Sequence, residues 1–247
     1  MDKIEQLKEF INESRNIVFF TGAGISCASG IPDFRSENGL YNQSSKGIFT
    51  PEEIISHSFF YRYPEDFFKF YFSKMIYPSA KPNLAHIFIA KLAQYKNVTV
   101  ITQNIDGLHS EAGSKNVLEL HGSIYRNYCV ECNRFYKLNE IINQTVPHCD
   151  VCGGIIKPDV VLYEEGLDDE IVLKAVNAIR KADCLIIIGT SLTVYPAASY
   201  IRFYHGNKMV LINKQSTPFD SNADLVFNDD VINVFSQCQG ILNEELK

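Results

Sequence analysis

Short apolar runs alternate with amphipathic stretches along most of the 247-residue chain. The runs resemble strands that are buried on both faces, and they lie at residues 16–21, 98–102, 117–120, 184–188, 209–212 and 224–227. Apolar residues at helical spacing occur at about residues 3–14, 84–95, 168–181, 195–205 and 231–243. This alternation predicts an α/β fold, a Rossmann-like parallel sheet covered by helices on both faces.

Two stretches leave this pattern and return to it. Residues 36–82 are loop-rich and then strongly aromatic, and residues 123–155 contain paired cysteines. We expect both to be insertions that pack together as a second, smaller domain, whose core contains most of the phenylalanines between Phe59 and Phe72. The Rossmann-like domain then comprises residues 1–35, 83–122 and 156–247. A cleft between the two domains is the expected ligand site.

The cysteine pairs have the spacing of a metal site. Cys129, Cys132, Cys149 and Cys152 form two C-x-x-C pairs, so that two tight turns can supply four thiolates to one zinc ion. Four thiolates leave no open coordination position, which indicates a structural zinc. Disulfides are disfavoured because nothing marks the chain as secreted. The single cysteines Cys27, Cys184 and Cys238 are expected to be reduced and buried.

Net charge and hydropathy limit the classes of binding partner that we expect. A net charge of −6 argues against a specific nucleic-acid partner, because phosphate binding needs an excess of Lys and Arg. The first residues lack the apolar core of a signal peptide, and no apolar run approaches the ~20 residues of a membrane span. We therefore expect a cytoplasmic protein without a membrane partner. The oligomeric state is not encoded in any visible pattern, and a monomer is the default.

A glycine-rich loop, Gly22 to Arg35, follows the first predicted strand. Glycines at a strand end let backbone N–H groups approach a phosphate. Cys27 stands where the dinucleotide fingerprint G-x-G-x-x-G has its third glycine, and the ribose-binding acidic residue of a dehydrogenase is missing. The loop therefore favours a dinucleotide and disfavours hydride transfer.

Six motifs together resemble the sirtuin family. They are G-A-G-x-S-x-x-S-G-I-P-D-F-R at Gly22–Arg35, T-Q-N-I-D at Thr102–Asp106, H-G at His121-Gly122, the four cysteines, G-T-S at Gly189–Ser191 and I-N-K at Ile212–Lys214. The chain is similar to the bacterial type with a four-cysteine zinc ribbon. Sirtuins are NAD-dependent protein lysine deacylases. The resemblance therefore implies a Rossmann-like domain with an inserted small domain that consists of a zinc ribbon plus a helical module. It also implies NAD as co-substrate, one structural zinc, and acylated-lysine proteins or peptides as partners.

The resemblance also implies which residues bind NAD. The implied set is Gly22, Ala23, Gly24, Phe34, Arg35, Gln103, Ile105, Asp106, Gly189, Thr190, Ser191, Asn213, Asp230 and Val231. Ala23, Phe34 and Arg35 correspond to contacts with the diphosphate and the nicotinamide ribose, and Asp106 to the nicotinamide carboxamide. Thr190, Ser191 and Asn213 would hold the adenosine ribose, and Asp230 and Val231 would lie near the adenine.

The implied catalytic residues are His121 and Asn104. His121 would remove a proton from the nicotinamide ribose after the acyl oxygen of the modified lysine has attacked C1′ and released nicotinamide, and Asn104 would position a water and the ribose. An imidazole with an ordinary pKa of about 6.5 can serve as such a base. The products would be free lysine, nicotinamide and O-acetyl-ADP-ribose. The other histidines are expected to be structural.

Residues Val160, Val161, Leu162 and Tyr163 resemble the sirtuin segment that pairs with the substrate peptide by backbone hydrogen bonds. The family pattern Phe-Gly-Glu is replaced by Tyr163-Glu164-Glu165. The side chain at 164 is expected to leave the strand register intact, and its charge would favour basic residues beside the acylated lysine.

Residues Tyr71 to Lys74 allow a prediction of the preferred acyl group. They resemble the Tyr-x-x-Arg pair of sirtuins that prefer malonyl or succinyl lysine, but Lys74 stands in the place of the arginine. Lysine cannot supply the bidentate fork of arginine, so neutral acyl groups should react faster than succinyl. Two alternatives stay open here. The same NAD site could serve a protein mono-ADP-ribosyltransferase, and the cysteines could belong to a non-enzymatic zinc-ribbon binding module.

Overall fold

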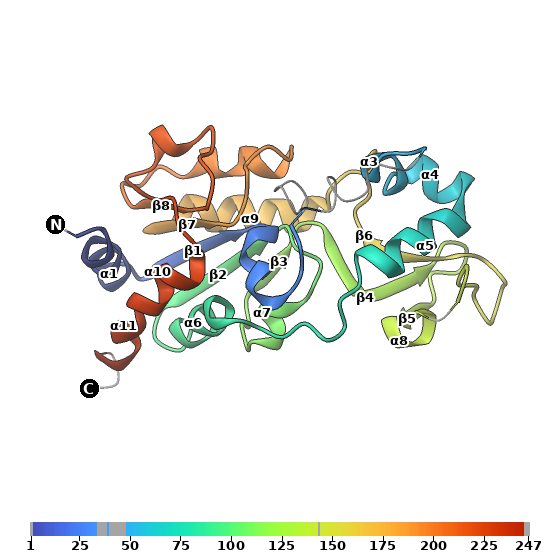
Figure 1. Cartoon of the computed structure of the whole chain (residues 1–247), viewed down its shortest axis with the longest axis horizontal. Coiled ribbons are helices and arrows are strands. Elements are labelled where there is room, and N and C mark those ends of the chain that lie inside the picture. Colours follow the sequence, from blue (N-terminus) through green and yellow to red (C-terminus); the bar gives the residue numbers. More distant parts are fainter. Residues whose placement is uncertain (1, 34–38, 40–47, 143, 245–247) are drawn as a thin grey trace.

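The computed structural model describes residues 2–33, 39, 48–142 and 144–244, with the backbone alone for residues 242–244. Its central sheet has six parallel strands in the order β3-β2-β1-β7-β8-β9 (Figure 1). The strands are β1 (Asn16–Thr21), β2 (Asn97–Thr102), β3 (Val117–Glu119), β7 (Cys184–Ile188), β8 (Met209–Ile212) and β9 (Leu225–Phe227). All six lie where the sequence predicts them, and their order is that of Rossmann domains.

Continuous burial explains these strands. β7 has five consecutive buried residues, and β1 and β2 each have five after an exposed or half-buried first residue. Such runs need cover on both faces of the sheet. The strand pairs keep one register without interruption, from Ile17 opposite Val98 to Thr21 opposite Thr102, for example. The carboxyl ends of β1 and β2 are therefore level, and the loops after them share one edge of the sheet.

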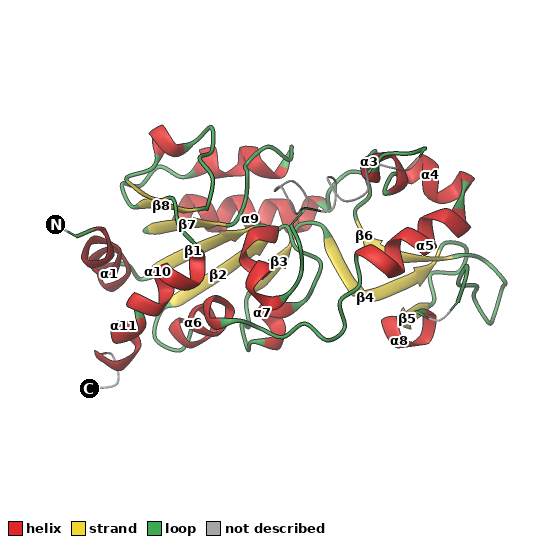
Figure 2. Ribbon diagram, viewed as in Figure 1, coloured by secondary structure: helices red, strands yellow, loops and turns green. Residues whose placement is uncertain are grey.

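Two layers of helices cover the sheet (Figure 2). On one face, α1 (Lys3–Glu13), α6 (Leu84–Leu92) and α10 (Val231–Gln237) pack on alternate strand residues such as Phe19 and Ile186. On the other face, α9 (Asp169–Lys181) and the 3₁₀ helix η2 (Ala197–Phe203) pack on Phe20 and Ile187. Successive side chains of a strand point to opposite faces of the sheet, so neighbouring residues such as Phe19 and Phe20 belong to two separate cores.

Two predicted helices differ from the structure. The pattern at 231–243 is divided into α10 and α11 (Gln239–Glu244), because Cys238 ends the first helix and its N–H bonds to the carbonyl of Phe235. The pattern at 195–205 forms the shorter η2. Three short elements complete the large lobe, and they are η1 (Ala23–Ser29), α7 (Leu108–Glu111) and η3 (Asp220–Asn222).

The small lobe contains an antiparallel sheet with the order β5-β4-β6. Its elements are α3 (Pro51–Ile54), α4 (His57–Arg62), α5 (Pro64–Lys74), β4 (Gly122–Cys129), β5 (Phe135–Lys137), α8 (Leu138–Ile141) and β6 (Ile156–Val160). Phe60, Phe67 and Phe68 are fully buried beside Tyr71, with ring centroids 5.0 to 6.4 Å apart. The phenylalanine cluster is thus the core of this lobe, as predicted.

The second small-lobe segment, from β4 to β6, is joined to the large lobe by two connections. The chain passes from β3 of the large sheet through Leu120 and His121 directly into β4 of the small sheet (Figure 1). It returns through β6, which was expected in the Rossmann-like domain but pairs with β4 in the small sheet. No helix in the described part of the chain is long and apolar enough to cross a membrane.

Candidate active site and zinc site

The candidate active site lies where the strand order reverses direction, at the carboxyl ends of β1 and β7. Loops from these ends form a crevice in which ligands of Rossmann folds bind. A cavity of about 260 Å³ opens here toward the small lobe, and a second one of about 480 Å³ runs along the large lobe. Both are lined by Ile31 and Pro32, so the two cavities adjoin, and we refer to them together as the cleft.

Glycines make the crevice narrow. The N–H of Gly24 donates to the carbonyl of Gly189 at 2.8 Å. A Cβ atom on Gly24 would lie 2.6 Å from the Cα of Gly189, and Gly189 has a φ of 59°, which favours glycine. The two loops therefore touch backbone to backbone, and Gly24 and Gly189 both line the larger cavity.

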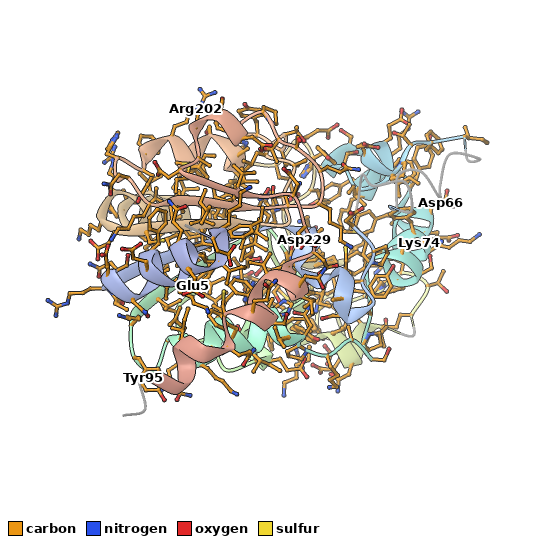
Figure 3. All side chains as sticks on the ribbon, turned by 60° about the vertical axis from the view of Figure 1, so that its left-hand side comes forward. Glu5, Asp66, Lys74, Tyr95, Arg202 and Asp229 are labelled. Carbon is orange, nitrogen blue, oxygen red and sulfur yellow. The ribbon has the colours of Figure 1, made fainter. Side chains whose placement is uncertain are left out.

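The predicted NAD residues separate into two groups along the cleft. Those in the smaller cavity are Ala23, Gln103, Asn104, Ile105 and Asp106, together with His121. Those in the larger cavity are Gly24, Gly189, Asn213, Asp230 and Val231. Figure 3 shows Asp229, another residue of the larger cavity, in the middle of the molecule and Lys74 on the small-lobe helix α5. One extended ligand could therefore contact both groups.

Three further predicted residues, Gly22, Thr190 and Ser191, are not among the residues that line either cavity. Gly22 N–H extends the sheet by donating to the carbonyl of Ile188, and Thr190 accepts a hydrogen bond from Gln103 at 3.2 Å. The Ser191 hydroxyl lies 2.7 Å from that of Thr193. Phe34 and Arg35 lie outside the described residues. The contacts of all these residues with NAD stay predictions.

His121 has a defined tautomer. Its Nδ1 lies 2.9 Å from the carbonyl oxygen of Gln103. A carbonyl can only accept, so Nδ1 carries the hydrogen of the neutral ring and Nε2 has the free lone pair. Burial lowers the pKa of His121, although the Gln103 contact opposes this shift. The ring is therefore neutral at pH 7 and can accept a proton at Nε2.

Asn104 and Asp106 are connected through Ser26 of η1. The Ser26 hydroxyl donates to Asp106 Oδ2 at 2.7 Å and accepts from Asn104 Nδ2 at 3.1 Å. The N–H of Leu108 donates to Asp106 Oδ1 at 2.9 Å. Burial raises the pKa of Asp106, and these hydrogen bonds oppose the shift. Each carboxylate oxygen keeps a lone pair for a ligand donor.

The small-lobe wall of the cleft contains the predicted peptide segment, since residues 160–165 all line the smaller cavity. Val161 N–H donates to the carbonyl of His121 at 3.1 Å. Tyr163 N–H donates to the carbonyl of Ile55, and Tyr163 C=O accepts from the N–H of His57, both at 3.0 Å. One edge of the segment is thus paired within the protein, and pairing of the segment with a substrate peptide stays a prediction.

Several cleft residues were not predicted. Val194, Tyr195 and Pro196 also line the smaller cavity, and Ser26 of η1 is hydrogen-bonded to both Asn104 and Asp106. Ser26 could have been found because it belongs to the first motif. Apart from the Tyr195 hydroxyl, these three residues have no polar side-chain atom, so no chemical pattern marks this part of the lining. Cys27 differs from its prediction, because it is half-buried and lines the larger cavity.

The four paired cysteines come together in the small lobe. All their Sγ atoms lie within 4.8 Å of one another, with 3.4 Å between Cys129 and Cys152 and 3.6 Å between Cys132 and Cys149. Sulfurs about 2.3 Å from one tetrahedral zinc are about 3.8 Å apart, so the cluster fits this ion. The Tyr136 hydroxyl and the Val151 N–H donate to the Cys149 sulfur, as expected of partners to a thiolate.

Two further histidines are buried in the large lobe. His86 on α6 and His109 on α7 are at most 2% exposed, and their ring centroids are 4.7 Å apart. His109 Nε2 lies 3.0 Å from Thr21 Oγ1, and His86 Nδ1 accepts from the Asn83 N–H at 3.4 Å. Burial lowers the pKa of His86 to about 4 and that of His109 to about 3, with His86 adding to the shift of His109. Both are neutral structural residues at pH 7.

Known proteins match this architecture over nearly its full length. The Sir2 family model matches residues 22–196. An NAD-dependent protein deacetylase of Clostridium perfringens (strain 13 / Type A) is 61% identical over 233 residues, 93% of this chain and 96% of that protein. One of Staphylococcus aureus (strain Mu50 / ATCC 700699) is 47% identical over 232 residues, 94% of this chain and 96% of that protein.

Solved structures agree with the sequence matches. A Sir2 structure with p53 peptide and NAD+ has a TM-score of 0.84 and 39% identity, and covers 99% of both chains. A Sir2 variant with a deacetylated p53 peptide and 3′-O-acetyl-ADP-ribose has a TM-score of 0.89 and 40% identity, and covers 96% of this chain and 97% of the other. The glycine-rich crevice, the histidine at the cleft and the four-cysteine cluster thus occur in a chain that belongs to the Sir2 family, the sirtuins.

Proposed function

We propose that this chain is an NAD-dependent protein lysine deacetylase in which His121 is the general base. The observation that carries the assignment of His121 is its hydrogen bond to the Gln103 carbonyl, which fixes the free lone pair on Nε2. His121 lines the same cavity as Asn104 and Asp106, where a ligand can meet all three. The relatives from Clostridium and Staphylococcus share this activity by name.

NAD, when bound, supplies an electrophilic ribose carbon and accepts the acyl group, giving nicotinamide and O-acetyl-ADP-ribose. Asp106 accepts a hydrogen bond from the nicotinamide carboxamide, and Asn104 positions the ribose and a water. His121 takes the proton of a ribose hydroxyl at Nε2. These residues are held by one another through Ser26 and Gln103, so the site is ordered before its ligands arrive.

The adenosine half of NAD fits the larger cavity. Its lining has Asn213 at the end of β8 and Asp230 before α10, and the backbone contact between Gly24 and Gly189 forms its floor. Asn213 would bind the ribose hydroxyls together with Thr190 and Ser191, with the adenine near Asp230 and Val231. Lys214 Nζ already lies 2.8 Å from the Asp230 carboxylate, which holds that side chain at the rim.

The substrate is an acylated lysine within an extended peptide. Residues 160–163 and 194–196 line the smaller cavity together with His121 and Asp106. Lys74 lines this cavity, whereas Tyr71 is fully buried in the small-lobe core. A lysine ammonium is a point charge without the fork of arginine, so neutral acetyl and longer apolar acyl groups react faster than succinyl.

The zinc ion has a structural role. Four thiolates fill its coordination sphere, and these four cysteines do not line either cavity. Thiolates at a zinc site and free thiols at Cys184 and Cys238 fit a reducing compartment. We assign the protein to the cytoplasm on this basis.

The test is product analysis with NAD and one peptide carrying acetyl, myristoyl or succinyl lysine. We expect nicotinamide, O-acyl-ADP-ribose and free lysine in equal amounts, with the lowest kcat/KM for succinyl. Nicotinamide released equally well without acylated peptide would indicate ADP-ribosyl transfer instead. A zinc-containing protein that does not bind NAD would leave a binding module as the function.

A further inference from the structure

The cleft wall ends in a β-turn that has an unusual residue at its third position. Glu165 N–H donates to the Leu162 carbonyl at 3.0 Å, which closes a turn over residues 162–165. Glu164, the third residue, has a φ of 76°, and Tyr163 before it is not in the positive-φ region. This combination is that of a type II turn, whose third position favours glycine. A glutamate at this position is strained unless other contacts hold it.

The Glu164 side chain makes such contacts across the lobe. Its Oε2 accepts hydrogen bonds from the Ser58 N–H at 2.8 Å and from the Ser58 hydroxyl at 2.5 Å. Ser58 lies in the first turn of α4, where backbone N–H groups have no partner within the helix. The two hydrogen bonds lower the pKa of Glu164, the hydroxyl contact more than the N–H contact. The carboxylate thus caps α4 and fixes the turn to it.

Glu165 fixes the other end of the turn. Its Oε2 accepts from the Leu162 N–H at 2.9 Å and from Lys157 Nζ at 3.0 Å, and its Oε1 lies 2.9 Å from His57 Nδ1. The backbone of Tyr163 is paired with the segment 55–57 on the same side. Because every one of these attachments is on the small-lobe side of the turn, they hold its opposite side toward the cavity.

We propose that Glu164 is a positioning residue for the acylated peptide, a proposal that rests on the proposed function. Its carboxylate holds the 162–165 turn in a glycine-like conformation by anchoring it to α4. The wall that receives the peptide backbone is then formed before the substrate binds, and ordering it adds no cost to binding. Glycine could adopt this turn without strain, but it would lack the anchor.

The proposal revises one expectation from the sequence. A charge at position 164 was expected to attract basic residues beside the acylated lysine. The Glu164 carboxylate accepts both of the hydrogen bonds described above from Ser58, so its negative charge interacts with α4 of the small lobe. We therefore expect the preference for basic flanking residues to depend little on Glu164.

The test compares binding of an acetylated peptide, by fluorescence anisotropy, with binding of NAD. Glu164→Ala keeps the strained backbone without its anchor, and we expect its peptide Kd to rise about fivefold, the scale of a lost helix cap. We expect a smaller rise for Ser58→Ala, which removes one of two donors, and for Glu164→Gln, whose amide oxygen can still accept. Asp66→Ala is the matched control, because it removes an exposed carboxylate from the first turn of α5 in the same lobe.

A second readout separates positioning from general damage. Free N-acetyl-lysine has no flanking peptide backbone, so its KM should stay unchanged in Glu164→Ala, as should the KM for NAD. Equal peptide affinity in wild type and Glu164→Ala would overturn the proposal, as would a parallel loss of NAD affinity. A wild-type protein that binds no acetylated peptide would overturn the proposed function itself, which is a different result.

Discussion

The large lobe is stabilised by continuous apolar strands such as β7, with five buried residues in succession and helices on both sides. The small lobe has three short strands, a cluster of stacked aromatic rings and four thiolates. A six-stranded sheet buries enough apolar surface to fold by itself, whereas small modules commonly need a metal. The comparison shows that one chain can join two lobes with different sources of stability at a common active site.

Removal of the zinc ligands should have the largest effect and should act on the small lobe first. Cys149→Ser leaves three thiolates and an incomplete site, so we expect loss of bound zinc and loss of order in the small lobe, because metal binding and folding are coupled. Deacetylase activity should then disappear with the peptide wall. Zinc content measured by atomic absorption and near-ultraviolet circular dichroism test this.

Cys184→Ala is the matched control for the zinc prediction. Cys184 is fully buried in β7 of the large lobe and is remote from the four-cysteine cluster. We expect this variant to lose some stability and to keep one zinc per chain. A metal-free Cys149→Ser protein with normal stability and activity would show that the small lobe does not depend on the ion.

Replacement of His121 should stop the chemistry while both lobes stay folded. We expect His121→Ala to lower kcat by at least ~100-fold, the scale of lost general-base catalysis, with little change in the affinity for NAD or peptide. His205→Ala, an exposed histidine of the large lobe, is the control. Single-turnover rates and titrations of both ligands distinguish the two effects, and a correctly folded variant with normal turnover would refute the assignment.

The pH dependence of kcat/KM offers a second test of His121. Burial lowers the pKa of this residue below its ordinary value of about 6.5. The base is active when neutral, so activity should be retained at pH 7 and fall only when acidification protonates the ring. The acid limb of the kcat/KM profile should therefore lie below pH 6.5, and an acid limb above that value would contradict the structure.

Acid should weaken the large lobe through its buried histidine pair. The unfolded chain binds protons at His86 and His109 below about pH 6.5, whereas the folded chain binds them only near pH 4 and pH 3. The contribution of the pair to stability is thus complete above pH 6.5 and declines as the pH falls toward these values. Each histidine lowers the free energy of unfolding by up to ~1.4 kcal/mol per pH unit in this range.

The double variant His86→Asn and His109→Gln isolates this effect. Asn can accept at the place of His86 Nδ1, and Gln can reach Thr21 at the place of His109 Nε2. Urea unfolding at pH 7.5 and pH 5 should show a smaller loss of stability in the variant than in the wild type, by about 2 to 4 kcal/mol. An identical loss in both proteins would mean that other groups cause it.

The smallest expected effect concerns the aromatic core of the small lobe. The Tyr71 hydroxyl is buried and has no hydrogen-bond partner among the described residues. Burial raises the pKa of Tyr71, which keeps the hydroxyl neutral. Tyr71→Phe should therefore leave stability unchanged or raise it by up to ~1 kcal/mol, since it removes an unsatisfied polar group. Thermal unfolding measures this, and a clear loss of stability would reveal a partner for the hydroxyl.

The large lobe was more predictable from the sequence than the small lobe. Runs such as Cys184–Ile188 are apolar throughout, so their burial is evident without any tertiary information. Strand β6 was not predicted, because it is short, includes Pro158 and alternates buried with half-buried residues. Which sheet such a strand joins depends on pairing with β4, a long-range contact that no local pattern specifies.

The candidate site shows the same division. The cysteine cluster was predicted from the spacing of its side chains, and His121 and Asp106 were singled out by motifs that resemble the sirtuin family. The wall at Val194–Pro196 acts through shape, and the glycine-like turn at Glu164 could not be seen because a glutamate does not indicate a positive φ. Backbone conformation is thus the part of this site that the sequence does not display.

The crossing between the lobes has a mechanical consequence. Gly122 has a φ of 75°, and a Cβ there would lie 1.9 Å from the Asp159 carbonyl oxygen, so only glycine fits. His121 precedes it, and its own carbonyl holds Val161 of the returning strand. Two of the connections between the lobes therefore lie side by side at His121. A rotation of the small lobe about this point would move its distant parts furthest and the His121 imidazole least.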